Sequence, residues 1–329
     1  MTATGRSVLL TGVAGFVGSH LAADLLARGY TVHGLDVADP GAARLLDPVV
    51  DHPNFAYTRA DVRDADAVRA WYRPEAETLY HLASVVGVRR YMEDPLGLID
   101  IVVGGTRTLL ELAAQHDTRF LLTSTSEVFG KNPAVPWAED GDRVLGPTSV
   151  DRWSYSSAKA VCEHMVYGMH RARGLRFSIV RLFNAYGPGQ NPIYVVSQSV
   201  QRALRGEAPQ VFDTGRQTRC FTYVGDVVEG IVRAGERPEA LGEVFNLGSD
   251  RESTIAEVVR TVCEQAGYDL PPETFDTAAE YGEVYEDIPR RVPAVGKARA
   301  LLGWEAGTSL ADGVKQTVEW ARANPWYLA

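Results

Sequence analysis

Residues 7–29 read SVLLTGVAGFVGSHLAADLLARG, and this stretch decides the fold. A short apolar run, Ser7–Leu10, is followed by glycines and then by an amphipathic pattern, as at the start of a βαβ unit. The glycines permit a tight turn, a close approach of the backbone to a pyrophosphate, and close packing of helix on strand. The helix start adds unpaired N–H groups and a partial positive charge. Glycines alone could form a plain loop, but this context predicts a dinucleotide-binding turn made by Gly12, Gly15, Phe16, Val17 and Gly18.

An acidic residue at the end of the second strand indicates which dinucleotide binds. The first helix ends at Arg28-Gly29, Thr31–Leu35 is the expected strand, and Asp36 follows it. A carboxylate there accepts hydrogen bonds from the ribose hydroxyls of adenosine and repels a 2′-phosphate. The next arginine, Arg44, comes later, so the sequence favours NAD over NADP. The alternative interpretation of Asp36 is a helix-capping residue.

Further apolar runs extend the pattern into a parallel sheet. We expect strands at 54–58, 78–82, 119–124 and 177–182, and short strands at 220–224 and 244–247 that return to the sheet. His81, inside one of these runs, is interpreted as a packed strand residue rather than a base. The cofactor contacts expected beyond the glycine turn are Asp61 and Val62 at the adenine, and Leu82, Ala83 and Ser84 at the nicotinamide ribose.

The predicted fold class is α/β, a Rossmann-type doubly wound parallel sheet with a smaller C-terminal substrate-binding domain. After residue 182 the alternation of strand and helix weakens. We assign residues 1–184 to an NAD-binding domain to which 218–249 returns, and residues 185–217 and 250–329 to the substrate domain. Helices are expected at about 195–205 and at the C-terminus, where Ser309 caps an amphipathic pattern.

The stretch WSYSSAKAVCE, residues 153–163, carries the predicted chemistry. Tyr155 and Lys159 are four residues apart, so on a helix they lie one turn apart on one face. The ammonium, with a nearby nicotinamide cation, lowers the tyrosine pKa from about 10 towards working pH. The phenolate can then accept a proton from a substrate hydroxyl while hydride leaves the same carbon. Alone, this spacing is typical of an ordinary surface pair.

Hydroxyl groups and one carboxylate follow the 119–124 strand in TSTSEVFG, residues 123–130. Ligands of open α/β sheets bind at this carboxyl edge of the strands. Burying several hydroxyls beside Glu127 without partners would be costly. A polar substrate is therefore the expected partner.

Composition narrows the class of protein. The chain has 329 residues, 45% of them hydrophobic and 23% charged, with a net charge of −9, which argues against a nucleic-acid partner. Cys162, Cys220 and Cys263 are far apart, which indicates free thiols rather than disulfides or a zinc site. The first residues are too polar for a signal peptide, and no apolar run is long enough to span a bilayer. We expect a cytoplasmic protein with no metal and no membrane partner.

With Gly12-x-x-Gly15-x-x-Gly18, Ser124-Thr125, Tyr155-x-x-x-Lys159 and Asn184-x-Tyr-Gly-Pro in this order, the chain resembles the extended short-chain dehydrogenase/reductase family. Its nearest resemblance is to nucleotide-sugar epimerases, dehydratases and decarboxylases, over residues 8–320. The resemblance implies that Tyr155 is the base for the sugar 4-hydroxyl and that Lys159 also binds the nicotinamide ribose. It implies that Thr125, with Ser124 nearby, hydrogen-bonds the reacting oxygen. The substrate ligands that it implies are Asn184, Arg219 and Arg291.

The reaction that follows C4 oxidation is predicted from shorter matches. Four stretches resemble UDP-glucuronate decarboxylases: Tyr91-Met92-x-x-Pro95, TSTSEV at 123–128, Arg152-Trp-x-Tyr, and Glu286-Asp287 with Arg290-Arg291-x-Pro293. In that branch Ser126, Glu127 and Arg291 would serve the substrate carboxylate and the protonation that follows its loss.

Other outcomes of the same first step stay open. A uronate 4-epimerase would share most of these stretches. A 4,6-dehydratase is disfavoured because Thr125-Ser126-Glu127 replaces the usual Thr-Asp-Glu. A remote alternative is a non-catalytic NAD-binding regulator. Val102 replaces an asparagine of many relatives, which puts a proton relay through that position in doubt.

The resemblance also implies an assembly state. Helices near 98–115 and 156–173 have apolar faces, and in this family such a pair forms a four-helix contact. We therefore expect a homodimer that acts on a nucleotide sugar with NAD as cofactor.

Overall fold

Seven parallel strands form the central sheet of the computed structural model, which describes residues 6–87, 93–269, 271–275, 288 and 290–329. The strand order is β11-β6-β5-β4-β1-β2-β3. This arrangement confirms the predicted α/β class with a Rossmann-type sheet. The strands are β1 (Ser7–Thr11), β2 (Thr31–Asp36), β3 (Phe55–Arg59), β4 (Thr78–His81), β5 (Arg119–Thr125), β6 (Phe177–Leu182) and β11 (Glu243–Leu247).

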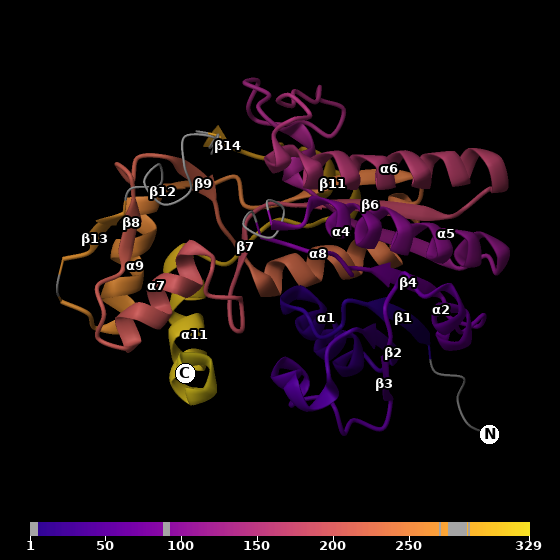
Figure 1. The fold of residues 1–329 in the computed structure, drawn as a ribbon, viewed down its shortest axis with the longest axis horizontal. Helices are drawn as coiled ribbons and strands as arrows, with labels where there is room; N and C mark the ends of the chain where they lie inside the picture. The colour runs from indigo at the N-terminus through magenta and orange to yellow at the C-terminus, as the bar shows by residue number, and fades with distance from the viewer. Residues whose placement is uncertain (1–5, 88–92, 270, 276–287, 289) are drawn as a thin grey trace.

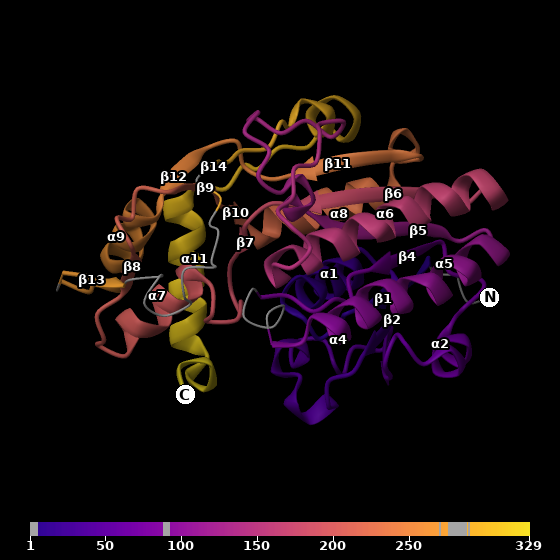
Figure 2. The same ribbon diagram turned by 45° about the horizontal axis from the view of Figure 1, so that its top comes forward.

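Helices cover both faces of this sheet, because its strands carry apolar residues on both sides. Within β1, Val8 and Leu10 belong to one hydrophobic cluster and Leu9 to the other. Helices α1 (Phe16–Ala27) and α8 (Val224–Glu236) contribute to the first cluster. Helices α2 (Ala65–Trp71), α5 (Gly105–Gln115) and α6 (Ser154–Arg173) contribute to the second. Figures 1 and 2 show α5 and α6 running side by side next to the strands of the sheet.

The helix predicted near 98–115 is longer and contains a π-helical turn. It runs through α4 (Pro95–Ile99), the π-helix η3 (Asp100–Gly104) and α5. The Val102 carbonyl accepts hydrogen bonds from the Thr106 hydroxyl at 2.6 Å and the Cys162 thiol at 3.3 Å. Val102, which stands where many relatives carry asparagine, thus has an apolar side chain, and its backbone carbonyl accepts hydrogen bonds from residues of α5 and α6.

In the described part of the chain, the second lobe is built from short strands and three helices that share one core. Figure 1 shows it beside the sheet, with the C-terminus on its lower side. Ser309 caps the last helix as predicted, its hydroxyl accepting from the Asp312 N–H at 3.1 Å. The helices are α7 (Val195–Leu204), α9 (Ile255–Ala266) and α11 (Leu310–Ala323). The strands are β7 (Ala185–Tyr186), β8 (Gln210–Phe212), β9 (Thr218–Cys220), β10 (Thr222–Tyr223), β12 (Glu252–Thr254), β13 (Glu273–Phe275) and β14 (Arg290–Arg291).

The prediction that 220–224 returns to the central sheet is wrong. β9 pairs with β12 and β14 in a separate sheet, and β10 pairs with β7. The physical reason is that β5 occupies one edge of β6, and β11 hydrogen-bonds along the whole of the other. The segment η7 (Ala298–Leu302) with Trp304 packs into the α1–α8 cluster of the sheet, so the range 250–329 contributes to both lobes. The division of the chain into two domains therefore stays a proposal.

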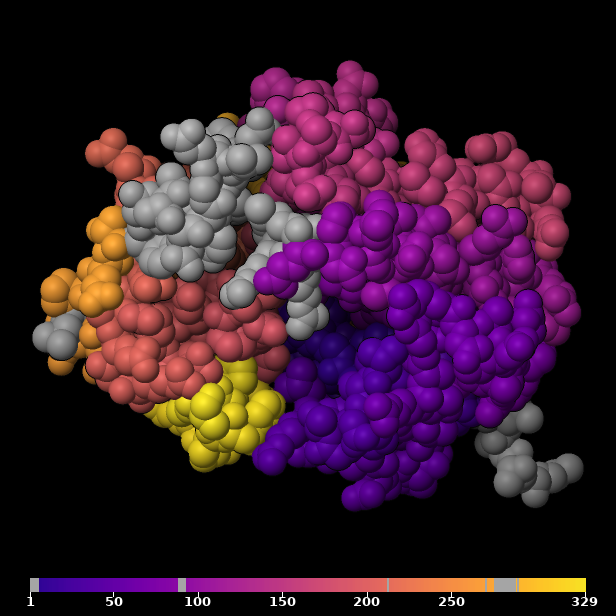
Figure 3. Space-filling model, viewed as in Figure 1, coloured from indigo at the N-terminus to yellow at the C-terminus, as the bar shows by residue number. Residues whose placement is uncertain are grey.

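A hollow separates the two lobes, and Figure 3 shows dark indigo atoms of the N-terminal segment on its floor. The described helices include none that is long and apolar enough to cross a membrane.

Candidate active site

The glycine turn after β1 has the close contacts that its sequence predicts. Gly12 has a φ of +73°, a left-handed conformation that favours glycine. A Cβ at Gly18 would lie 2.0 Å from the Gly12 carbonyl oxygen, so a larger residue would push α1 away from the turn. Gly15 is exposed at the start of α1, with Phe16 and Val17 next to it. The turn therefore leaves its backbone open to a ligand at a helix N-terminus.

Asp36 stands at the end of β2 beside this turn. Its carboxylate accepts from the Ala14 N–H at 3.0 Å and from the Ala38 N–H at 3.1 Å. Asp61 lies after β3 in an ion pair with Arg63 at 2.7 Å, which holds the pKa of Asp61 below its ordinary value. Val62 is buried in the core against α5. The structure thus places Asp36 at the turn, while the roles of Asp61 and Val62 at an adenine stay predictions.

The end of β4 approaches the turn through a buried hydrogen-bond network. The His81 ring lies between the Thr11 hydroxyl at 2.7 Å and the Thr106 hydroxyl at 3.0 Å. Burial lowers the pKa of His81 to about 3, so the ring is neutral at physiological pH. This confirms His81 as a packed strand residue. The strand then leads into Leu82, Ala83 and Ser84, and the Ala83 N–H donates to Thr11 Oγ1 at 3.3 Å.

Tyr155 and Lys159 lie on α6 under the carboxyl ends of the strands, and both are buried. Lys159 Nζ donates to the Thr123 carbonyl at 3.0 Å, which holds the ammonium beside β5. The phenol of Tyr155 is hydrogen-bonded by the side chains of Ser84 and Thr125. Burial raises the pKa of Tyr155 and lowers the pKa of Lys159. A phenol in this position can act as a base only when positive charge at the site offsets the effect of burial.

Glu127, in the short helix η4 (Ser126–Phe129), lies between two buried arginines. Its Oε1 accepts from Arg291 of β14, and its Oε2 lies 2.7 Å from Nη2 of Arg152. Although burial alone would raise its pKa, the two guanidinium groups lower it to about 2. Glu127 is therefore a fixed anion. Ser126 is buried next to it, at the start of η4.

The arginines predicted at the substrate come together across two short strands. Arg219 of β9 and Arg291 of β14 are register partners in a parallel pair, and both are buried. Asn184 lies two residues after β6, and its side-chain Oδ1 has no hydrogen-bond partner among the residues that the structure describes. These residues stand near the boundary of the two lobes. Their roles as substrate ligands stay predictions.

The hydroxyl group of Ser124, another predicted site residue, has a hydrogen-bond partner within the protein. It shares a face of β5 with Phe120 and Leu122, and its hydroxyl donates to Glu163 on α6 at 2.5 Å. Glu163 in turn forms a buried two-pronged ion pair with Arg181, at 2.7 and 3.0 Å. Ser124 thus joins β5 to α6, and its contact with a substrate stays a prediction.

Two features of the site were not assigned in the sequence analysis. Parts of two stretches that resemble decarboxylases lie outside the described residues. Arg152 was noted only within a matching stretch, although its position three residues before Tyr155 puts both on one helical face. The Glu163–Arg181 pair left no local signal. Tyr91-Met92 and Glu286-Asp287 lie outside the described residues.

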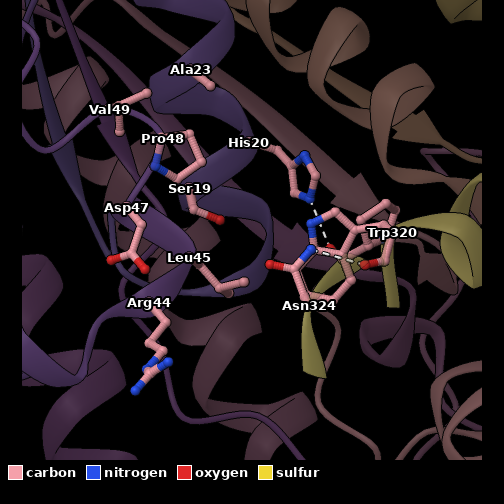
Figure 4. Close-up of a pocket in the computed structure, with 11 residues that line it drawn as sticks. Ser19, His20, Ala23, Arg44, Leu45, Asp47, Pro48, Val49, Trp320 and Asn324 are labelled. Carbon is pink, nitrogen blue, oxygen red and sulfur yellow. Dashed lines mark hydrogen bonds between the residues drawn. The ribbon is translucent and has the colours of Figure 1, made fainter. Parts of the chain in front are cut away.

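A separate cavity of about 150 Å³ lies between α1, residues 44–49 and α11. Figure 4 shows Asp47, Pro48 and Val49 on one side of it and Trp320 and Asn324 on the other, and His20 Nε2 lies 2.8 Å from the Pro188 carbonyl. The cavity lining includes none of the predicted site residues.

The residues around the glycine turn fit NAD. A Cβ at Gly15 would meet the Gly12 carbonyl oxygen at 3.2 Å, so the open backbone matches a pyrophosphate seated on α1. The Asp36 carboxylate stands where ribose hydroxyls would be bound, and its negative charge opposes a 2′-phosphate. The chain would hold NAD with the turn, Asp36 and Lys159.

Comparisons with known proteins agree with this geometry. Residues 8–248 match the family model described as the NAD dependent epimerase/dehydratase family. The chain is 34% identical over 322 residues to a UDP-N-acetyl-alpha-D-glucosaminuronate decarboxylase of Bacillus cytotoxicus, covering 96% of this chain and 98% of the relative. It is 38% identical over 320 residues to UDP-glucuronic acid decarboxylase 2 of Arabidopsis thaliana, covering 96% and 68%. It superposes with a TM-score of 0.85 and 25% identity on UDP-glucuronic acid 4-epimerase of Bacillus cereus in complex with UDP-glucuronic acid and NAD, covering 97% and 99%.

Proposed function

The chain belongs to the NAD dependent epimerase/dehydratase family, and from that premise we propose that it oxidises a UDP-hexuronic acid at C4 and then decarboxylates it. At the level of the family it is an NAD-dependent enzyme of the extended short-chain dehydrogenase/reductase type that modifies nucleotide sugars. What we propose beyond the family is the identity of the sugar and the reaction that follows its oxidation at C4. Named decarboxylases of uronic acids among its relatives support it.

The observation that carries the proposal is the buried Arg152–Glu127–Arg291 cluster close to the catalytic tyrosine. Glu127 directly follows Thr125 and Ser126, and its charge is among those that raise the pKa of Tyr155. A neutral hexose carries no negative charge that would match two buried guanidinium groups, whereas a hexuronic acid does. Guanidinium groups bind carboxylates in a two-pronged geometry, so the cluster suits a C6 carboxylate.

The chain's residues would act on the substrate in a fixed order. Tyr155, as phenolate, accepts the proton of the C4 hydroxyl, while Thr125 and Ser84 hydrogen-bond the phenol oxygen. Lys159 stabilises the phenolate by its charge. Bound NAD would supply the redox chemistry, accepting hydride from C4 and returning it at the end.

The ketone at C4 makes the substrate a β-keto acid. When the C5–C6 bond breaks, its electron pair moves into the enolate at C4 and C5, and carbon dioxide leaves. A proton supplied by solvent water is then added at C5, and, after hydride returns to C4, Tyr155 returns its proton to the oxygen at C4. Glu127 is held ionised by its arginines, so its part is to orient Arg291 and Arg152 rather than to donate a proton.

A uronate 4-epimerase is the second candidate, and the similarity to UDP-glucuronic acid 4-epimerase favours it. Purified protein is incubated with UDP-glucuronate and with UDP-N-acetylglucosaminuronate, and products are followed by mass spectrometry and proton spectra. A pentose nucleotide with release of carbon dioxide is expected. A product of unchanged mass would replace the proposal with epimerisation, and absence of turnover with every nucleotide sugar would favour a regulator.

We propose that the enzyme is a homodimer joined through α4, α5 and α6. Leu96, Ile99 and Val161 expose 74%, 38% and 44% of their surface along these helices, which pack against one another. A Cβ at Gly104 or Gly168 would meet no atom within 4 Å, so a second helix pair could approach closely there. Sedimentation at micromolar concentration should give twice the chain mass, and a strict monomer would contradict this.

We also propose a cytoplasmic location. All three cysteines are buried free thiols, which suits a reducing compartment. Fractionation of the source cells with a membrane-marker control tests this directly.

A further inference from the structure

Arg152 has donor groups that nothing in the described structure uses. It lies in the short helix η5 (Asp151–Trp153) and is only 3% exposed. Nη2 forms the ion pair with Glu127, whereas Nε and Nη1 have no hydrogen-bond partner. A buried charged donor without an acceptor is costly. Among the described residues the Arg152 side chain therefore has unused donors that could bind one further acceptor.

The charges of the cluster lead to the same conclusion. Arg152 and Arg291 carry two positive charges, while Glu127 carries one negative charge and uses one oxygen for each arginine. A positive charge buried without compensation is strongly unfavourable. One further anion would balance the cluster, and a planar carboxylate matches the fork of a guanidinium group.

The position of Arg152 relative to Tyr155 identifies that anion. The η5 helix runs directly into α6, so residues 152 and 155 lie on one face about one turn, or roughly 5.4 Å, apart. Tyr155 acts at C4 of the sugar under the proposed function, and the C6 carboxylate is attached to the adjacent ring carbon. The spacing of Arg152 and Tyr155 thus matches the spacing of the C6 carboxylate and the C4 hydroxyl of a hexuronic acid.

We propose that Arg152 binds the C6 carboxylate of the substrate through Nε and Nη1 and is the residue that selects uronic acids over neutral sugars. This rests on the proposed function. Arg291 and Glu127 would then serve to orient Arg152 and to complete the anion site.

Binding is measured in the Tyr155→Phe background with NAD present, so that turnover does not interfere. The ligands are UDP-glucuronate and UDP-xylose, which differ only by the carboxylate, and titration calorimetry gives both affinities. Arg152→Met should weaken UDP-glucuronate by roughly tenfold to a hundredfold, as expected for a lost charged hydrogen bond, and change UDP-xylose by less than about threefold. Equal losses for both ligands would indicate a structural role and overturn the inference, as would no loss for either.

Arg152→Lys serves as the second variant, since it keeps the charge beside Glu127 but lacks the fork. It should reduce the preference for UDP-glucuronate at least about fivefold while NAD affinity is unchanged, and an unaltered preference would overturn the inference even if Arg152→Met fails to fold. If the parent Tyr155→Phe protein binds neither nucleotide sugar, the proposed function itself fails. If it binds both and the Arg152 variants do not change their ratio, only the role of Arg152 fails.

Discussion

Replacing Glu127 by glutamine tests the fixed-anion interpretation of the site through stability rather than activity. The pKa of Glu127 falls from its ordinary 4.5 to about 2 in the folded protein, because Arg291 and Arg152 favour the ionised form. A depressed carboxyl pKa adds stability that is fully present above the unfolded value and is lost as pH falls through the folded value. The difference corresponds to about 3 kcal/mol at neutral pH, similar to the cost of breaking a buried ion pair.

The assay is urea unfolding followed by tryptophan fluorescence over a range from about pH 7 to pH 3. Glu127→Gln should lose about 3 kcal/mol at pH 7, and roughly two-thirds of that difference should vanish by about pH 3. Glu264→Gln is the matched control, because Glu264 faces Arg260 at 3.8 Å but is 63% exposed, so it should cost less than about 1 kcal/mol. A loss below about 1 kcal/mol at pH 7, or one that does not change with pH, would refute the reasoning.

Three further outcomes follow from the geometry. Tyr155→Phe should keep NAD and nucleotide-sugar binding but lower kcat by at least about a thousandfold, because the proton acceptor is gone; stopped-flow absorbance of NADH checks this, and unchanged turnover would remove Tyr155 from the mechanism. Gly18→Ala should abolish NAD binding and lower Tm, since its Cβ would lie 2.0 Å from the Gly12 oxygen, whereas Gly296→Ala, with no atom within 4 Å, should leave NAD titration and Tm unchanged. Val161→Glu should halve the sedimenting mass without loss of NAD binding, and an intact dimer would place the interface elsewhere.

The central sheet was predictable because its inner strands, such as β4 and β5, are buried along their whole length, whereas the edge strand β3 is only partly buried. The glycine turn and the Tyr155–Lys159 pair were predictable because each is formed by residues that are close together in the sequence. Residues 220–224 also have the sequence pattern of a strand. Both edges of β6 are already paired, with β5 and β11, so these residues pair outside the central sheet.

The anion cluster could not be predicted in full, because its members meet only through the tertiary structure. Arg219 and Arg291 are paired across strands two or three residues long, which are too short to show any periodicity. Ser124 was expected near the substrate because it adjoins Thr125. Its side chain instead shares the face of Phe120 and Leu122, and Glu163 takes its hydroxyl. The contact between Ser124 and Glu163 depends on how α6 packs against β5, and the local sequence does not indicate that packing.

The ion pair between Glu127 and Arg291 crosses from the sheet lobe to the β9–β14 sheet of the other lobe. The two arginines that hold Glu127 ionised therefore come from different lobes. A chimera that grafts the outer lobe of another relative onto this sheet, without an arginine at position 291, would leave Glu127 paired with Arg152 alone. Only an exchange that carries both position 127 and position 291 would keep this arrangement of charges between the lobes.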